Sequence, residues 1–467
     1  MKKTLLIIPS GAVKVYEKSK IKAAISEIPY ISQAMLGAML AKENLAVKIL
    51  DLSTSKENNQ TLIDKTIIEF QPTHIGVSFT TPLTDEAYSI AKQIKKMDQK
   101  KILIAGGVHP TCRPIEVLNS SDFDVCVIGE GDETIVELIN SEDYSQIKGI
   151  AYKDKNLKII QTSARDLIEN LDSLPFAKWD LYDLNAYKNS PLTSRASPVG
   201  AIETSRGCVF ACTYCNKKTF SRKFRMKTPK RVVDEIEHML KSGFKEIHIW
   251  DDMFTTNLER AKLICDEIIK RGLKFPWCLA CGIRVDIVDE DFLRKAKEAG
   301  CYSVYFGIES GDDQVLKDID KKITTSQVRT AVKIAKKMGL ETTGFFMIGL
   351  PTDTKETIKK TINFAKSLPL DYAKCTILVP YPETKIYEEW EQKGYIISKE
   401  WSKYNFHTAS KVYNHPNLSW EELSKYYNQF YREFYFNPRY IIRRVQTDLK
   451  TGRLGVTLKY AIKTWWS

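Results

Sequence analysis

The sequence predicts an α/β protein: a doubly wound parallel sheet, then a partial barrel of six strand–helix units, then a small helical region. Three observations support this fold class. β-rich runs alternate with helix-period segments through most of the 467 residues, and 43% of residues are hydrophobic. No apolar run reaches the ~18 residues that a membrane-spanning helix needs. The chain can therefore bury the cores of two or three globular domains.

The first domain should comprise residues 1–145. The pattern predicts strands at 4–8, 46–50, 74–79, 101–104 and 125–128, and helices at 31–42, 63–70, 85–97 and 133–140. In such sheets, the loops at the carboxyl ends of the strands line the ligand crevice. The candidate binding residues in these loops are Ser10, Thr80, Thr81, Gly106, Gly107, His109, Gly129 and Glu130. No Walker A loop and no Gly-x-Gly-x-x-Gly motif occurs, so ordinary nucleotide binding lacks its usual signature.

Residues 146–198 should connect the two domains. Residues 148–160 alternate around a polar turn, which is typical of a β-hairpin. The segment that follows carries Pro175, Pro191 and Pro198 among serines, which favours an extended strap.

Residues 199–395 repeat a strand and then a helix six times. The expected strands are 200–204, 246–250, 277–283, 303–306, 343–348 and 372–379, and the expected helices are 230–241, 258–270, 289–299, 326–338, 355–366 and 384–393. Gly339 is placed to end the fourth of these helices. Six units are fewer than the eight of a closed barrel, so we expect an open side that admits substrate.

Cys208, Cys212 and Cys215 follow the first expected barrel strand with spacings of x3 and x2. Three thiolates can hold three irons of a cubane cluster and leave the fourth iron open to a small ligand. A zinc site, which normally needs a fourth nearby ligand, and three unrelated buried thiols are the alternatives. The other cysteines are scattered, which indicates reduced thiols rather than a disulfide framework.

Polar residues also stand at or near the ends of later barrel strands, where barrel active sites lie. Asp251, Arg284 and Glu309 are the charged candidates, and ordinary ion pairs at the barrel rim are the alternative reading. Cys278 and Cys281 look like half of a metal site. They are three residues apart on an expected strand and so should point to opposite faces, which makes core packing the better reading.

These motifs resemble known families. The cysteine spacing resembles the signature of the radical S-adenosylmethionine (SAM) superfamily. Gly106-Gly-Val-His109-Pro-Thr111 with Gly129-Glu-Gly131 resembles the Rossmann-like cobalamin-binding domain of radical SAM proteins, which include hopanoid-type methylases and anaerobic porphyrin cyclases. The resemblance implies a TIM-like partial barrel in which the three cysteines hold a [4Fe-4S] cluster. The SAM contacts that it implies are Tyr214, Asp251, Arg284, Gly307, Glu309, Ser310 and Pro380.

By the same resemblance, cobalamin should lie against the loops of the first sheet. The Asp-x-His-x-x-Gly motif, whose His ligates cobalt in other cobalamin proteins, is absent, so cobalt would lack that lower ligand. His109 could substitute for it or could simply be a hydrogen-bonding residue. The last barrel loop departs from the family's Pro-Tyr-Pro-Gly-Thr pattern because Glu383 replaces the glycine, which puts a backbone contact there in doubt.

The resemblance implies an enzyme that cleaves SAM reductively to a 5′-deoxyadenosyl radical and methylates an unactivated carbon of a small molecule or lipid. A radical oxidative cyclase or carbon–carbon bond-forming enzyme is the first alternative, and a non-catalytic cobalamin or redox sensor is the second. An external electron donor such as flavodoxin or ferredoxin is expected. The sequence identifies no catalytic acid or base. Cys278 has the same parity as Arg284 and could face the barrel lumen as a hydrogen donor or ligand, although core packing is the better reading.

Residues 396–467 are rich in Tyr and Trp, with helical periodicity at 420–436 and 438–447. Residues 439–467 contain seven basic residues and one acidic residue, Asp448, and the whole chain has a net charge of +12. A helical cap over the open barrel, a membrane-interfacial segment and a nucleic-acid surface are the three readings, and the lack of a known RNA-binding module disfavours the last. The short apolar run Leu5–Ile8 is no signal peptide, so we expect a cytoplasmic protein with possible peripheral membrane contact.

Overall fold

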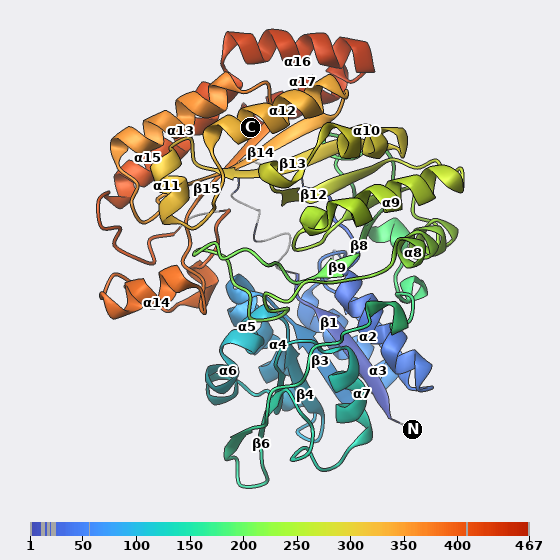
Figure 1. Cartoon of the computed structure of the whole chain (residues 1–467). Helices are drawn as coiled ribbons and strands as arrows, with labels where there is room; N and C mark the ends of the chain where they lie inside the picture. Colours follow the sequence, from blue (N-terminus) through green and yellow to red (C-terminus); the bar gives the residue numbers. More distant parts are fainter. Residues whose placement is uncertain are drawn as a thin grey trace.

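A computed structural model of the chain describes residues 2–10, 15, 19, 25–55, 57–407 and 410–465. Two α/β units follow each other along the chain and pack together, with the N-terminal unit below the partial barrel in the view of Figure 1. The predicted fold class is confirmed. Residue 1, where the expected first domain begins, and residues 466 and 467, where the expected last domain ends, lie outside the described residues.

The N-terminal sheet has seven strands in the order β2-β1-β3-β4-β5-β6-β7. The first five strands in this order are parallel. The strand order reverses between β1 and β3, and doubly wound sheets bind ligands at such a switch point. The strands are β1 Lys3–Ile8, β2 Ala46–Asp51, β3 His74–Ser78, β4 Ile102–Gly106, β5 Val125–Val127, β6 Ile150–Lys153 and β7 Ile159–Gln161.

Helices cover both faces of this sheet because alternate strand residues are apolar on both sides. Leu5 and Ile7 of β1 pack with the α3/α4 side, whereas Leu6 and Ile8 lie on the α2 side. The helices are α2 Ile31–Lys42, α3 Asn59–Phe70, α4 Thr84–Met97, α5 Val108–Cys112, α6 Pro114–Ser120 and α7 Asp132–Asn140.

The hairpin expected at 148–160 forms, and it adds β6 and β7 to the edge of the first sheet as antiparallel strands. Its residue Ile150 is buried in the same core as Val125. The covalent connection between the two units therefore begins after the hairpin. The boundaries at 145, 198 and 395 remain predictions.

The second unit is a six-stranded parallel sheet in the order β15-β14-β13-β12-β11-β8. β8 and β15 do not pair, so the barrel stays open, as the six-unit pattern predicted. Its strands are β8 Val199–Ile202, β11 Glu246–Ile249, β12 Trp277–Ile283, β13 Cys301–Glu309, β14 Glu341–Ile348 and β15 Tyr372–Ile377, and the short strands β9 Ser205–Arg206 and β10 Arg225–Met226 form a separate ribbon.

The barrel helices begin and end where their capping residues predict. Thr324 and Gln327 form a capping box at the start of α12, and Gly339 lies just past its end with φ +72°. The helices are α8 Pro229–Lys241, α9 Leu258–Lys270, α10 Glu290–Glu298, α11 Asp313–Asp318, α12 Thr325–Lys337, α13 Lys355–Ser367, α14 Lys385–Gln392, α15 Trp420–Tyr435, α16 Pro438–Thr451 and α17 Leu454–Trp465.

The helix expected at 384–393 forms as α14, but its packing differs from that of the other barrel helices. α14 lies on the side of α5 in the N-terminal unit (Figure 1). The Arg113 guanidinium of that unit lies 5.4 Å from the ring centre of Tyr387 of α14.

α15 covers β15 and its neighbour β14 instead. Tyr431 of α15 hydrogen-bonds to Cys375 of β15, and Phe430 packs against Phe346 of β14. The tail thus adds α15 to the outer helix layer, and whether it caps the open side remains a prediction.

Two tail tyrosines also form hydrogen bonds with backbone N–H and C=O groups on the free edge of β15. The Tyr431 hydroxyl accepts a hydrogen bond from Cys375 N (3.1 Å) and donates one to Cys375 O (2.9 Å). Tyr435, one turn later, does the same with Ala373 N (3.2 Å) and O (2.9 Å). An unpaired strand edge invites pairing with other chains, so these hydroxyls protect the open barrel.

α16 and α17 continue from α15 along the outside of the barrel. Tyr440, Arg444 and Asp448 form the buried stripe of α16, and Tyr440 donates a hydrogen bond to the carbonyl oxygen of Asp371. Among the described residues, none of the helices combines the length and apolarity needed to cross a bilayer.

We predict that Tyr431→Phe lowers the free energy of unfolding by about 1–3 kcal/mol, because it leaves the N–H and C=O groups of Cys375 buried without a partner. Urea unfolding followed by tryptophan fluorescence would measure the change. The matched control is Tyr426→Phe on the same helix, whose hydroxyl forms no hydrogen bond within the described structure. Equal unfolding free energies for the two variants would contradict the edge-protection role.

Candidate active site

The cysteine loop begins where β8 ends and is anchored by the β9–β10 ribbon. Gly207 precedes Cys208 with φ +85°, and a Cβ atom there would lie 2.3 Å from the carbonyl oxygen of Lys223. Only glycine fits this position. The ribbon and Gly207 therefore fix the point from which Cys208, Cys212 and Cys215 project, all three as free thiols.

The three thiols lie in a partly buried, electropositive environment. Burial raises the pKa of the Cys215 thiol, whereas the ammonium of Lys217 opposes that rise. Burial lowers the pKa of Lys217, but the charges of Cys215 and Cys208 outweigh it and raise this pKa overall. A lysine in this position stabilises thiolates, which are the form that binds iron.

The donor set suits a cluster better than a single ion. Among the described residues, no three His, Cys, Asp or Glu side chains converge as they would around one metal ion. A cubane cluster does not need such convergence, because each cysteine binds a different iron. The loop supplies three free cysteines, the number that a cluster with one open iron needs.

Glu309, Lys321 and Tyr214 form a group at the carboxyl end of β13. The Lys321 ammonium donates to Glu309 Oε1 (2.8 Å) and to the Tyr214 hydroxyl (3.2 Å). Glu309 has φ +66°, and a Cβ on Gly307 would approach both Lys321 Nζ (2.9 Å) and Glu309 Oε1 (3.0 Å). Burial, reinforced by the Glu309 charge, raises the pKa of Tyr214 well above its usual range. Three expected SAM residues thus meet beside the cysteine loop.

Arg284 and Asp251 are engaged within the protein. The Arg284 guanidinium pairs with Asp286 (2.8 Å), donates to the Lys321 carbonyl oxygen (2.7 Å) and lies 3.8 Å from the ring centre of Phe210. Through this contact with Phe210, Arg284 packs against the cysteine loop. Asp251 accepts hydrogen bonds from Thr204 and Ser205, so it joins the ends of β8 and β11.

Ser310 and Pro380 are both buried. The Ser310 hydroxyl lies 3.1 Å from Thr361 Oγ1 and therefore links β13 to α13. Pro380 begins the loop that reaches the cysteine segment, where Asn216 donates to the Pro382 carbonyl oxygen (2.8 Å). The role of each expected SAM residue remains a prediction.

Glu383 adopts φ +62°, the left-handed conformation that glycine favours. The family pattern has glycine here, so the backbone geometry is kept although the residue differs. The Glu383 carboxylate pairs with Arg113 of the N-terminal unit (3.3 Å) and Lys218 of the cysteine loop (3.2 Å). These ion pairs bring together the last barrel loop, the cysteine loop and the N-terminal sheet.

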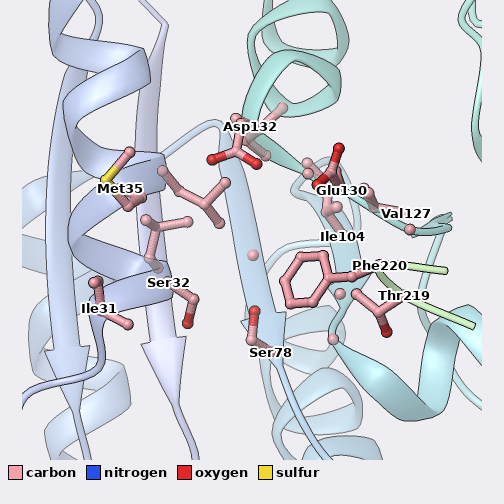
Figure 2. Close-up of a pocket in the computed structure, with 18 of the residues that line it drawn as sticks. Ile31, Ser32, Met35, Ser78, Ile104, Val127, Glu130, Asp132, Thr219 and Phe220 are labelled. Carbon is pink, nitrogen blue, oxygen red and sulfur yellow. The ribbon is translucent and has the colours of Figure 1, made fainter. Parts of the chain in front are cut away.

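A cavity of about 190 Å³ opens at the carboxyl ends of β1, β3, β4 and β5 (Figure 2). Ile31 and Met35 of α2 form one wall, and Ile104 and Val127 of the sheet form another. The glycines that line it are Gly76, Gly106, Gly107, Gly129 and Gly131. Side chains at Gly106 and Gly129 would occupy the cavity or its edge, since an added Cβ meets nothing closer than 3.5 and 3.8 Å.

This cavity fits part of a corrinoid. Its volume is below the 300–1,000 Å³ or so that a drug-sized ligand fills, which suits one ring system such as a nucleotide base. Its apolar walls and bare backbone would accept a flat ring. Phe220, which follows the cysteines, also points into the cavity (Figure 2), so the cysteine loop forms part of its wall.

The other expected cobalamin residues lie away from this cavity. Ser10 hydrogen-bonds to Glu86 (2.5 Å for its hydroxyl) and does not line the cavity. His109 is fully buried between Phe79 and Trp401, with Nδ1 3.3 Å from Thr81 Oγ1. Burial, helped by the charge of Arg113, lowers the His109 pKa to about 4, so the ring is neutral. Thr80, exposed at the end of β3, is also outside the lining.

Glu130 lines the cavity, but its carboxylate belongs to a buried ion-pair network between the two units. Arg225 Nη1 lies 2.7 Å from Glu130 Oε1, and Arg206 lies 3.2 Å from Glu130 and 2.9 Å from Asp132. The four side chains are at most 8% exposed. The sequence analysis missed this network, although Arg206 stands directly before Gly207 and Cys208, which was the available signal.

Comparisons with known proteins agree with this geometry. The model of the radical SAM superfamily matches residues 202–365, and the model of the B12-binding domain matches residues 24–139. An uncharacterized methyltransferase of Pyrococcus horikoshii is 34% identical over 95% of this chain and 94% of its own length. An anaerobic magnesium-protoporphyrin IX monomethyl ester cyclase of Cereibacter sphaeroides is 28% identical over 86% of this chain and 68% of its own.

The solved structures include a close match in fold. The radical S-adenosylmethionine methyltransferase TsrM from Kitasatospora setae, determined with cobalamin and a [4Fe-4S] cluster bound, superposes with a TM-score of 0.74. The match covers 92% of this chain and 91% of that chain at 18% identity. The arrangement of both units is therefore shared.

Proposed function

The chain belongs to the radical SAM superfamily and carries its B12-binding domain, and we propose that it is a cobalamin-dependent methyltransferase that replaces a C–H bond of a small molecule by C–CH₃. It is a radical SAM enzyme, and its cofactors are a [4Fe-4S] cluster, SAM and cobalamin. The relatives that support methylation are the methyltransferase of P. horikoshii and, by fold alone, TsrM.

The observation that carries this proposal is the shared boundary of the two sites. Arg206 and Phe220 line the cavity of the N-terminal sheet and flank the three cysteines in sequence. A group bound in the cavity would therefore adjoin whatever the cysteines hold. Such proximity converts a transfer between two cofactors and a substrate into reaction within one enclosed site.

When bound, the reduced cluster supplies the electron that cleaves SAM, and cobalamin supplies the methyl group. The protein's part is to hold and orient. Lys217 favours the thiolate form of the cysteines, and Arg284 fixes Phe210 inside their loop. Glu309, kept in place by Lys321, offers carboxylate oxygens beside Gly307, where the missing side chain leaves room for this ion pair.

A radical oxidative cyclase is the second candidate, because a relative that covers 86% of the chain is a cyclase. Product mass separates the two functions. Methylation adds one CH₂ to the substrate mass, whereas cyclisation removes hydrogens. The non-catalytic sensor has no comparable support among these relatives.

The electron would come from an external low-potential donor such as flavodoxin or ferredoxin. The net charge of +12 favours an acidic partner of this kind. Lys217 and Lys218 beside the cysteines add local positive charge.

We predict that Cys212→Ala removes the visible absorbance of the reconstituted cluster and reduces SAM cleavage to 5′-deoxyadenosine to background. Two thiolates leave a second iron without a protein ligand, so the cluster is lost. Anaerobic reconstitution followed by spectroscopy and product chromatography would measure both. Cys281→Ala is the control, since Cys281 is exposed and is not one of the three loop cysteines.

An intact cluster and full SAM cleavage in Cys212→Ala would contradict the assignment. Loss of both properties in Cys281→Ala as well would show that the effect is not specific to the loop.

We also propose that α16 and α17 touch an anionic membrane surface. Ile441, Val445 and Leu449 recur at every fourth residue on the exposed side of α16 and are 43%, 38% and 63% exposed. Leu458 and Ile462 of α17 are 52% and 60% exposed. The one acid of these helices, Asp448, is buried against Arg444, so their exposed charges are basic. An apolar stripe with basic flanks favours anionic lipid.

We predict that the protein floats with phosphatidylglycerol-containing vesicles and not with pure phosphatidylcholine vesicles, since anionic lipid supplies the charge attraction. The double variant Ile441→Glu with Leu449→Glu should lose most of this binding. Leu157→Glu, which changes a 77% exposed leucine of the β6–β7 turn, is the control.

Wild-type protein that stays unbound with both vesicle types would contradict membrane contact. If light scattering then shows a dimer that the double variant abolishes, the stripe serves a second copy of the chain.

A further inference from the structure

The inside of the barrel carries a charged side chain that nothing above uses. Residues of β15 alternate, so Ala373, Cys375 and Ile377 are buried in the outer core. Lys374 has the opposite parity. It is half-buried, and its ammonium reaches inward toward Tyr305 of β13 and Phe345 of β14.

Two aromatic rings flank the Lys374 ammonium. Nζ lies 5.3 Å from the ring centre of Tyr305 and 5.6 Å from that of Phe345, and the two rings meet edge to face at 5.6 Å. Cation–π contacts of this kind are individually weak. They do not replace a counter-ion. Within the described part of the chain, Lys374 forms no hydrogen bond and no ion pair.

This lack of a partner is unlike the other charges inside the barrel. Glu246 accepts hydrogen bonds from His248 (2.7 Å) and Tyr302 (2.6 Å). Glu341 pairs with Arg195. Burial lowers the pKa of Lys374 to about 8, which records the cost of holding its charge there without an anion. Partial burial removes part of the water around an ammonium, so the unpaired Lys374 is placed to receive an anionic ligand.

The strand register places Lys374 next to the expected SAM site. Phe345 pairs with Gly307 on one side and with Lys374 on the other. Neighbouring strands are ~4.8 Å apart, so the Lys374 backbone is roughly 10 Å across the sheet from Gly307. Glu309 follows two residues later on the same strand. A small molecule bound to Lys374 would therefore lie between β15 and the SAM-binding end of β13.

We infer that Lys374 binds an anionic group of the substrate, a carboxylate or a phosphate-type group, while Tyr305 and Phe345 pack against the apolar atoms beside it. The inference rests on the proposed function for the neighbouring SAM site and specifies the class of substrate. A charge-assisted hydrogen bond from a partly buried ammonium orients its ligand strongly. The substrate carbon would thus be held at a fixed distance from its own anionic group.

The test uses full-length protein with reconstituted cluster, titrated calorimetrically with benzoate, phenyl phosphate and neutral benzyl alcohol. We expect at least one of the anions to bind at least tenfold more tightly than the alcohol, and the preferred anion shows whether the group is a carboxylate or a phosphate. Lys374→Met and Lys374→Gln should each weaken anion binding at least tenfold, which is about 1.4 kcal/mol. Lys374→Arg should retain it. Lys333→Met, on the exposed face of α12, is the control.

Unchanged anion binding in Lys374→Met and Lys374→Gln would overturn the inference, as would a wild-type protein that binds neither anion better than benzyl alcohol. Melting temperature gives a second readout. The preferred anion should raise it in wild type and not in the two neutral variants. SAM cleavage by wild-type protein without substrate tests the proposed function separately, because it needs no anion.

Discussion

The buried ion pairs of Arg206 and Arg225 with Glu130 and Asp132 are the contact on which the rest of the site depends. They join the two units at the point where the cavity of the first sheet meets the cysteine loop of the barrel. Removing one partner of such a network costs about 3–5 kcal/mol, because it leaves a buried charge uncompensated. Since Cys208 is only two residues beyond Arg206, the N-terminal carboxylates help to fix where the cysteines lie.

Around this contact, the structure brings together the carboxyl edges of two parallel sheets. The first sheet contributes an apolar, glycine-lined cavity, and the second contributes the cysteines and the Glu309–Lys321 pair. Two further contacts hold the barrel against the N-terminal unit at this junction. Glu383 pairs with Arg113, and the Trp401 indole donates a hydrogen bond to Glu116. A reactive carbon radical needs such enclosure, because water and stray hydrogen donors would otherwise quench it.

Much of this could be predicted from the sequence, because strands, helices and the cysteine spacing are local patterns. The bounds of α2, α9 and β12 agree with the pattern residue for residue. Long-range pairing could not be predicted. Arg206 and Asp132 are 74 residues apart and Arg225 and Glu130 are 95, so nothing local joins them. For the same reason, the sequence could not show that Asp251 binds Thr204 and Ser205, or that α15 rather than α14 covers β15.

The central claim is that one chain holds an iron–sulfur cluster and a corrinoid at a shared boundary. Its most direct test is the analysis of iron, sulfide and extracted corrinoid in protein purified without oxygen from cells supplied with cobalamin. The account predicts a [4Fe-4S] cluster and one corrinoid per chain. Zinc in place of iron, or a complete cluster without any bound corrinoid after incubation with hydroxocobalamin, would contradict it.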